Sequence, residues 1–239
     1  MNKIKVSAVS YTNTTPFIYG IKNTSLLSNI DLSLDIPSTC AQKLIDHTVD
    51  VGLVPVAALL HIPNYEIISD YCIGATGAVN SVFIFSNKPI QEIKTLRLDL
   101  QSRTSNNLAR VLLKNYWKQS VELVDSQDAD AFVEIGDRTF GKKGNYLFAY
   151  DMGEEWMNFT GLPFAFAVWA ANKHLPQEFI KEFNEAMKFG LDNRDKVIND
   201  LPKREDFDIA HYLNHSIDFM LTAEKKEAIA RFHHYIKEL

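Results

Sequence analysis

Hydrophobic and polar positions alternate along the first part of the chain in a way that predicts strands joined by helices. Residues 3–9 are apolar at every second position, which is typical of a half-buried strand, and residues 32–36 predict a second strand. The segment PSTCAQKLIDHT that follows has helical spacing, with a proline at its first position. Strand and helix signals in this order favour parallel strands with helices on both faces of the sheet.

More short apolar segments follow, and helical spacing dominates the last third of the chain. The run PFAFAVWAA is long for a strand, but it is too short to span a bilayer, which needs about 20 residues. From Gln177 onward the pattern predicts helices almost throughout. The segments expected to form further strands are 51–55, 65–71, 81–85, 96–98, 131–135 and 146–149.

Two polar segments indicate where the chain passes between two lobes. Residues 86–95, SNKPIQEIKT, look like a connection out of a first lobe, and residues 170–176 look like the return. We therefore expect residues 1–86 and 172–239 to form one lobe, and residues 87–171 to form the other. The predicted fold class is α/β with two lobes and a ligand cleft between them.

Composition narrows the classes of function. The 239 residues have a formal net charge of −5, which gives no support for nucleic-acid binding. The first residues show neither the apolar region nor the cleavage site of a secretory signal, and no run is long enough to cross a membrane. Two cysteines, Cys40 and Cys72, do not make a disulfide framework. We expect a cytoplasmic protein without a membrane partner, and no sequence feature sets its oligomeric state.

Four polar residues, Ser102, Arg103, Thr104 and Ser105, lie between a predicted strand and a predicted helix. The backbone N–H groups and the dipole at a helix N-terminus favour an anion. The two hydroxyls at positions 104 and 105 would add donors, and the arginine could clamp a carboxylate. Two interpretations explain these residues equally well. One is a carboxylate or phosphate site, and the other is an N-cap with more polar residues than capping needs and a solvent-exposed arginine.

Three further polar clusters also follow predicted strands. Ser38 and Cys40 lie in PSTCA, where a plain N-cap is the simpler explanation, and Asn80 and Ser81 end the segment GATGAVNS. The third cluster is YTNTTP, after the first predicted strand. Ligands of open parallel sheets bind beyond the carboxyl ends of the strands, so four such clusters together favour a site for an anionic small molecule.

Other candidates are weaker. Asp137 and Asp151 follow apolar segments, so they either point into a cleft or serve as turn and cap residues. His211 and His215 are four residues apart, but no third ligand accompanies them, and we expect no metal site. Cys40 has no histidine placed near it by a local pattern, so a buried or site-lining thiol is the better interpretation. No glycine-rich nucleotide motif is present, and no cofactor is expected.

Several blocks of sequence follow one another in a characteristic order: VSYTNTTPF, PSTCAQKL, DVGLVPVAAL, DLQSRTSNNLARVLL, EIGD and YDMGEEWMNFTGLPFAFAVWA. They cover roughly two thirds of the chain, and together they resemble the chorismate dehydratase family of the futalosine route to menaquinone. The resemblance implies a fold like that of the type II periplasmic solute-binding proteins, with two crossings between lobes and the ligand between them. Thr12, where the family commonly has leucine, and the pair Val133-Glu134 depart from its pattern.

The resemblance also implies an activity. Enzymes of this family remove water from chorismate and give 3-(1-carboxyvinyloxy)benzoate, with the substrate's own enolpyruvyl carboxylate proposed to take the ring proton. It assigns Asn13 to the leaving hydroxyl, Ser81 to the catalytic site, and the 102–105 cluster to a substrate carboxylate. The complete set of expected site residues is Asn13 and Ser81 as catalytic residues, with Ser38, Cys40, Asn80, Ser102, Arg103, Thr104, Ser105 and Asp137 as substrate-binding residues.

Two alternatives stay open from sequence. The sister enzyme that makes 1,4-dihydroxy-6-naphthoate shares the fold, but its first-strand motif typically contains a Cys-Pro-Asn-Asp-like turn, whereas this chain has SYTNTTP. A non-catalytic protein that binds a carboxylate, either a solute-binding protein or a sensor domain, would use the same cleft without chemistry.

Overall fold

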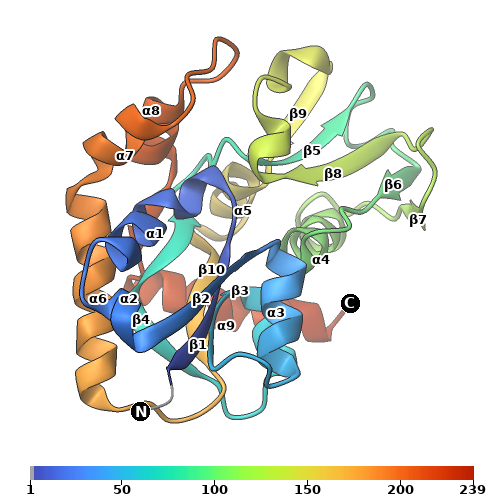
Figure 1. Ribbon diagram of the computed structural model, residues 1–239. Helices are drawn as coiled ribbons and strands as arrows, with labels where there is room; N and C mark the ends of the chain where they lie inside the picture. Colours follow the sequence, from blue (N-terminus) through green and yellow to red (C-terminus); the bar gives the residue numbers. More distant parts are fainter. Residues whose placement is uncertain (1–2) are drawn as a thin grey trace.

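The computed structural model describes residues 3–239 and arranges them around two separate β-sheets (Figure 1). The larger sheet has the strand order β11-β4-β10-β3-β1-β2, and the smaller has the order β7-β6-β8-β5-β9. The strands of the larger sheet are β1 (Ile4–Val9), β2 (Ile30–Asp35), β3 (Val51–Pro55), β4 (Glu66–Ala75), β10 (Phe164–Ala171) and β11 (Asp218–Met220). Those of the smaller sheet are β5 (Val82–Ser86), β6 (Thr95–Arg97), β7 (Glu122–Val124), β8 (Ala131–Ile135) and β9 (Phe148–Asp151).

Strand pairing is mixed. Parallel pairing, expected from the alternation of strands and helices, is confirmed for β1 with β2 and β3. It is wrong for β10, which runs antiparallel to both β3 and β4 because the chain enters the larger sheet from the opposite direction when it returns. Nearly all residues of β10 are buried, which explains why its sequence is apolar throughout and does not alternate. The edge strand β11 lies in a region expected to be helical, because three residues are too few to show a strand period.

Nine α-helices are present among residues 3–239, together with short 3₁₀ and π turns. The α-helices are α1 (Thr15–Lys22), α2 (Leu26–Asn29), α3 (Pro37–Ile45), α4 (Arg103–Val111), α5 (Met152–Thr160), α6 (Gln177–Asp192), α7 (Arg194–Asp200), α8 (Ile209–His211) and α9 (Ala223–Lys237). The shorter turns are η1 (Thr12–Thr14), η2 (Val56–His61), η3 (Leu112–Tyr116), η4 (Gly136–Thr139), η5 (Lys143–Asn145) and η6 (Tyr212–Ser216), of which η3 and η6 are π-helical. No helix in this part of the chain is both long and apolar enough to cross a membrane.

The helices pack on the sheets according to their apolar faces. In the larger sheet, α3 contacts β1 and β3, α6 contacts β4, and α9 contacts β10. In the smaller sheet, α4 contacts β8, while α5 contacts β5 and β9. The pair α1 and α6 approaches closely, because a Cβ atom added to Gly20 would come within 1.9 Å of the carbonyl oxygen of Ala186.

The chain crosses between the sheets twice. It leaves the larger sheet after β4, at Ala75, and enters the smaller one at Val82; it returns between Thr160 and Phe164 (Figure 1). The expected boundaries at residues 86 and 171 therefore need correction, since β5 belongs to the smaller sheet and β10 to the larger. The polar composition of residues 86–95 and 170–176 did not mark the crossings, because both crossings are only a few residues long and the strands beside them are buried.

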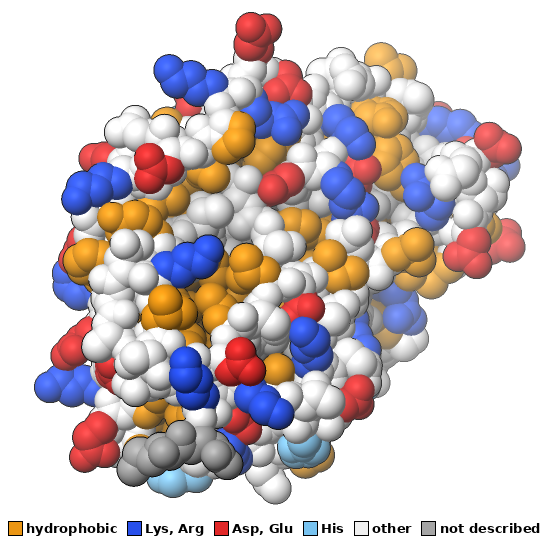
Figure 2. Space-filling view, in the orientation of Figure 1, with side chains coloured by type: hydrophobic (Ala, Val, Ile, Leu, Met, Phe, Trp, Pro, Cys, Tyr) orange, Lys and Arg blue, Asp and Glu red, His pale blue; other side chains and the backbone are white. Residues whose placement is uncertain are grey.

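Charged side chains are distributed over the surface without a dominant sign on the face that Figure 2 shows. Lys and Arg side chains there are interspersed with Asp and Glu side chains, around apolar patches. No continuous basic stripe crosses this face.

Candidate functional site

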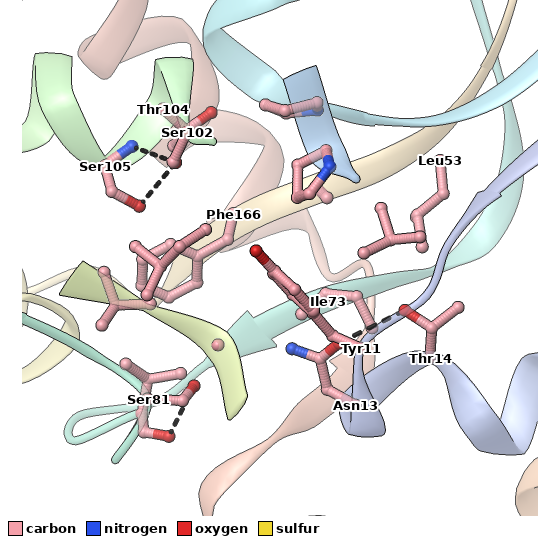
Figure 3. Close-up of a pocket in the computed structure, with 18 residues that line it drawn as sticks. Tyr11, Asn13, Thr14, Leu53, Ile73, Ser81, Ser102, Thr104, Ser105 and Phe166 are labelled. Atoms are coloured by element: carbon pink, nitrogen blue, oxygen red, sulfur yellow. Dashed lines mark hydrogen bonds between the residues drawn. The ribbon is translucent and has the colours of Figure 1, made fainter. Parts of the chain in front are cut away.

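A cavity lies between the two sheets and draws its walls from both (Figure 3). The space between its walls measures about 540 Å³, which includes open solvent at the mouth. Its lining residues are Val9, Tyr11, Asn13, Thr14, Pro37, Leu53, Pro55, Ile73, Val79, Ser81, Val82, Ser102, Thr104, Ser105, Ile135, Gly136, Phe166 and Ala167. None of these eighteen described residues has a side chain that is ionised at neutral pH, so an anion inside the cavity would meet neutral donors.

The start of helix α4 supplies one group of donors. Ser102 is the N-cap, and its Oγ accepts the backbone N–H of Ser105 at 3.0 Å. The Ser102 hydroxyl also donates to the Ser105 hydroxyl at 2.9 Å, which leaves the hydrogen of Ser105 without a partner in this pair (Figure 3). Thr104 Oγ1 accepts the backbone N–H of Ala57 at 3.1 Å, so its hydrogen is also available. Ser102, Thr104 and Ser105 are at most 6% exposed, and all three line the cavity.

Arg103, the fourth member of this cluster, lies elsewhere. Its Nη2 donates to Oε1 of Gln42 on helix α3 at 2.8 Å, and it is not among the lining residues. The expectation that Arg103 clamps a carboxylate therefore has no support in this geometry. Adjacent residues on a helix point in directions about 100° apart, so the hydroxyls of Ser102 and Thr104 can face the cavity while Arg103 does not.

A second polar group assembles from segments far apart in the sequence. Asn13, which follows β1 in the turn η1, donates from Nδ2 to the hydroxyl of Tyr212 at 3.2 Å. Thr14 donates to Oδ1 of Asn13 at 3.2 Å, and Tyr212 donates to Oγ of Ser81 at 2.8 Å. Asn13, Thr14 and Ser81 line the cavity, and burial raises the pKa of Tyr212 well above its usual range.

Ser81 is placed by a turn that the buried carboxylate of Asp151 organises. Asp151 accepts the backbone N–H groups of Val79 at 3.0 Å and Asn80 at 2.6 Å, and also caps helix α5 through Gly153 and Glu154. Burial raises the pKa of Asp151 against these hydrogen bonds. Of the two roles left open by sequence, Asp151 has the structural one.

Asn80 does not reach this cavity. Its backbone is left-handed, with φ of 54°, and its Nδ2 donates to Oγ of Ser216 at 3.1 Å. Asn80 lines a neighbouring hollow instead, together with Lys143 and His211. It holds the turn against η6 and does not extend the polar wall.

The cluster at the start of helix α3 also differs from expectation. Pro37 lines the cavity, but Ser38 and Cys40 do not. Cys40 is fully buried beneath the helix, where its sulfur lies 3.0 Å from the hydroxyl oxygen of Ser7. Ser7 also bonds Asp35, which pairs with Lys43 at 2.6 Å. Burial raises the pKa of the Cys40 thiol to about 12, so this cysteine is a neutral core residue.

Asp137 joins the two lobes at the edge of the cavity. Its carboxylate accepts the backbone N–H of Thr12 at 3.1 Å and the Thr12 hydroxyl at 2.9 Å. Burial raises the pKa of Asp137, and Asp137 is not among the lining residues. Thr12, one of the departures from the family pattern, thus has a defined partner.

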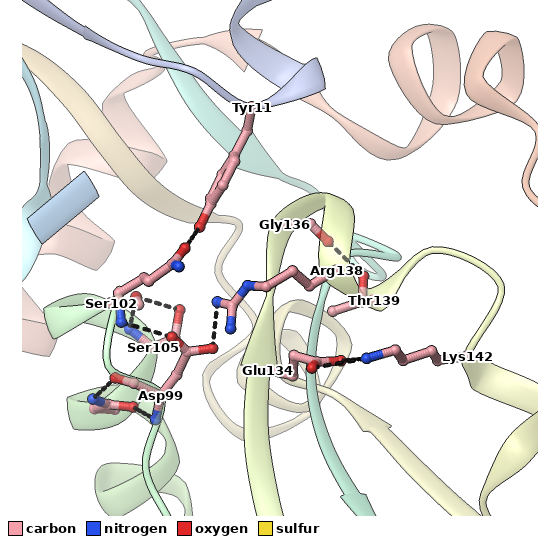
Figure 4. A network of polar contacts seen from close by, with 11 residues as sticks. Tyr11, Asp99, Ser102, Ser105, Glu134, Gly136, Arg138, Thr139 and Lys142 are labelled. Atoms are coloured by element: carbon pink, nitrogen blue, oxygen red, sulfur yellow. Dashed lines mark hydrogen bonds and ion pairs between the residues drawn. The ribbon is translucent and has the colours of Figure 1, made fainter. Parts of the chain in front are cut away.

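Tyr11 was not among the expected site residues, although it directly precedes the Thr12–Asn13 pair. Its ring lines the cavity, and its hydroxyl donates to Oε1 of Gln101 in the other lobe (Figure 4). A Cβ atom on Gly136, whose φ is +64°, would come within 2.6 Å of the Tyr11 ring, so only glycine fits there.

Beside Gln101, Asp99 accepts the backbone N–H of Gln101 at 2.7 Å and pairs with Arg138 at 2.6 Å (Figure 4). These contacts fix the position of Gln101, whose side chain meets Tyr11 of the other lobe. Tyr212 was also missed, because no local pattern in the helical C-terminal third connects it with Asn13.

With this geometry in view, similarity to known proteins identifies the family. Residues 4–238 match a family model described as menaquinone biosynthesis. The chain belongs to this family. It is 25% identical over 170 residues to a protein named chorismate dehydratase from Thermus thermophilus, a match covering 59% of this chain. The match spans 63% of the relative, which is less than two thirds of its length.

Solved structures confirm the fold of this family member. Protein AF1704 from Archaeoglobus fulgidus superimposes with a TM-score of 0.76 at 15% identity, covering 99% of this chain and 97% of that one. The Candida albicans CA3427 product, described as having the generic periplasmic binding protein fold, superimposes with a TM-score of 0.66 at 12% identity, covering 100% and 94%. The expected fold class, two lobes like those of periplasmic binding proteins, is confirmed.

Proposed function

We propose that this member of the menaquinone biosynthesis family is a chorismate dehydratase of the futalosine route. It would eliminate water from chorismate and release 3-(1-carboxyvinyloxy)benzoate. The observation that carries the proposal is the convergence of Asn13, Ser81 and the hydroxyls of Ser102, Thr104 and Ser105 on one cavity. The family match and the distant chorismate dehydratase relative support the same reaction.

The ring carboxylate of chorismate fits the start of helix α4. The hydrogens left over on Thr104 and Ser105 would bond its oxygens, and the partial positive charge of the helix N-terminus would add to them. Negative charge that develops on the ring during elimination spreads into this carboxylate. Donors already fixed around it would therefore bind the transition state more strongly than the ground state.

Asn13 and Ser81 would hold the ring hydroxyl that departs, from the opposite wall of the cavity. The ring C–H bond breaks and the enolpyruvyl carboxylate takes the proton. The electron pair forms the new ring double bond as the C–O bond breaks, and the departing hydroxide recovers the proton to leave as water. No lining residue among those described is a carboxylate or a histidine, which favours a base carried by the substrate itself. The protein's part is positioning and electrostatic stabilisation.

The test is to incubate the purified protein with chorismate and to follow the products by liquid chromatography and mass spectrometry. We expect a species one water lighter that retains the enolpyruvyl group. Saturable binding of chorismate without turnover would instead assign the chain to the non-catalytic carboxylate-binding proteins. Turnover of the 1,4-dihydroxy-6-naphthoate precursor but not of chorismate would assign it to the sister enzyme.

Replacing the asparagine tests the mechanism within this reaction. Asn13→Ala removes the proposed contact with the departing hydroxyl, and we expect the turnover number to fall by about 100-fold. Asn193→Ala, at an exposed helix end where the side chain bonds only Phe189, is the matched control and should leave turnover unchanged. Asn13→Ala with near-normal turnover and an unchanged melting temperature would remove Asn13 from the mechanism.

A further inference from the structure

Tyr212 lies behind the polar wall of the cavity, where its hydroxyl contacts two of the lining residues. The side chain is 1% exposed. Its Oη accepts a hydrogen bond from Nδ2 of Asn13 at 3.2 Å and donates one to Oγ of Ser81 at 2.8 Å. A single hydroxyl thus connects the two proposed catalytic side chains, which lie 68 residues apart in sequence.

The hydrogen bonds around Tyr212 all run in one direction. Thr14 donates to Asn13, Asn13 donates to Tyr212, and Tyr212 donates to Ser81. Thr14 bonds Oδ1 of Asn13, and Tyr212 bonds Nδ2 of Asn13. Together these two bonds fix the plane of the Asn13 amide and leave one N–H of Nδ2 without a partner. Ser81 is left with a long contact of 3.5 Å to the carbonyl of Val79, so its own hydrogen can turn to a ligand. Successive hydrogen bonds polarise one another, which makes the hydroxyl at the end of the chain a better donor.

The surroundings hold the Tyr212 ring in this position. Phe140 and Phe207 contact it edge-on, with ring centroids 5.2 and 5.4 Å away. Tyr212 also begins the π-helical turn η6, and such turns occur frequently at functional sites. The last residue of that turn, Ser216, accepts the side chain of Asn80, the neighbour of Ser81. Two bonds from one turn therefore fix the 80–81 segment.

We propose that Tyr212 is the positioning residue of this site, which sets the orientation of Asn13 and Ser81 toward the departing hydroxyl. The inference rests on the proposed function and deepens it, because it assigns a role to the C-terminal third of the chain. Tyr212 acts through Asn13 and Ser81 and is not itself a lining residue. Without its hydroxyl, the Asn13 amide can rotate about its last bond, and Ser81 loses the donor that directs its own hydrogen outward.

The kinetic test is Tyr212→Phe, which keeps the ring and removes only the hydroxyl. We expect the turnover number for chorismate to fall by about 100-fold, as misplaced catalytic groups do, with KM changed by less than about threefold. Tyr150→Phe is the matched control: Tyr150 also has a hydroxyl with a defined partner, the backbone N–H of Ile90, but lies outside the cavity. A merely structural role would lower the melting temperature of both variants and leave both turnover numbers near normal, which would overturn the inference.

A double-mutant cycle strengthens the kinetic test. If Tyr212 acts through Ser81, then Tyr212→Phe in a Ser81→Ala background should lower turnover by much less than about 100-fold. Fully additive effects would show that Tyr212 and Ser81 act independently, and the part of the positioning role that runs through Ser81 would be wrong.

A measurement that does not need turnover separates this inference from the proposed function. In protein labelled with ¹⁵N-asparagine, the side-chain amide signal of Asn13 is the one absent from Asn13→Ala. We expect this amide to exchange slowly with water in the wild type and in Tyr150→Phe, and at least about tenfold faster in Tyr212→Phe. Equal exchange in all three would overturn the positioning role. If the wild type does not convert chorismate, the proposed function fails, and the exchange rates alone decide whether Tyr212 orients Asn13.

Discussion

Helices α3 and α4 begin with similar sequences, but only α4 presents hydroxyl groups to the cavity. Each follows a strand, opens with small polar residues, and starts beside the same cavity. At α4, Ser102 caps the helix and the hydroxyls of Thr104 and Ser105 line the cavity. At α3, no side chain caps the helix, and Pro37 alone among its first residues reaches the cavity.

The difference lies in what each helix packs against. Helix α3 lies against β1 and β3, and its fourth residue, Cys40, points to Ser7 in β1. Helix α4 packs on the smaller sheet and turns its first polar residues toward the other lobe, where Thr104 meets the backbone of Ala57. Residue types at a helix start therefore indicate a possible anion site, while tertiary packing decides which hydroxyls reach it.

The largest effect expected from this comparison is on ligand binding. Replacing both Ser102 and Ser105 with alanine removes the hydroxyl pair, and we expect KM for chorismate to rise by about 10- to 100-fold, the range for hydrogen bonds to a charged group. The turnover number should fall as well, because the same donors stabilise the transition state. Ser105→Ala alone should act more weakly, because the hydroxyl of Ser102 then loses its acceptor and can turn to the ligand. The loss of the Ser102 cap should also cost about 1 kcal/mol of stability.

Ser38→Ala is the control for this pair, since Ser38 occupies the corresponding start of α3 without lining the cavity. Its KM should stay within about twofold of the wild type. A large rise in KM for Ser38→Ala, or none for the double variant, would contradict the contrast between the two helix starts.

A smaller effect concerns the thiol that α3 buries. The pKa of Cys40 is raised by burial from 9.0 to about 12, so the folded protein keeps the proton that the unfolded chain loses above pH 9. The stability that the protonated thiol contributes should therefore be complete below pH 9. The free energy of unfolding should then fall as the pH rises from 9 toward 12, by an amount on the order of 1 kcal/mol per pH unit. Denaturant unfolding at several pH values measures this loss, which should be smaller in Cys40→Ala.

Alkylation is a second test of whether the Cys40 thiol is buried. We expect iodoacetamide at neutral pH to modify neither cysteine of the folded protein, because burial raises the pKa of Cys72 to about 12 as well. Rapid modification of Cys40 under native conditions would show that it is accessible from the cavity, contrary to its place in the core.

How much of this was predictable differs between the two polar groups. The cluster at 102–105 could be found from sequence because a strand end, an N-cap and a helix are neighbours along the chain. The fold class followed from the order of strands and helices together with the resemblance to a known family. Asn13 was predicted through its motif, but its partner Tyr212 was not, because their contact spans 199 residues and depends on how the last third of the chain packs.

The strands at the two crossings show the same limit. Both β5 and β10 were placed in the wrong lobe, because a strand's own residues show that it is buried but not which sheet buries it. Arg103 and Asp137 do not line the cavity for another reason: each has a polar partner in the opposite lobe, Gln42 and Thr12, and no local pattern along the chain reveals such partners.

The smallest expected effect tests Arg103, the residue at α4 that sequence favoured most as a clamp. Its hydrogen bond to Gln42 is exposed and joins α4 to α3 across the two lobes. Exposed contacts of this kind are worth about 0.5 kcal/mol or less, so Arg103→Ala and Gln42→Ala should each change KM by no more than about twofold. If Arg103 instead turns to the ligand once chorismate binds, Arg103→Ala alone would raise KM by about tenfold or more, while Gln42→Ala would leave KM unchanged or lower it by releasing the arginine. Measuring both variants side by side therefore separates a contact between two helix starts from a direct contact with the substrate.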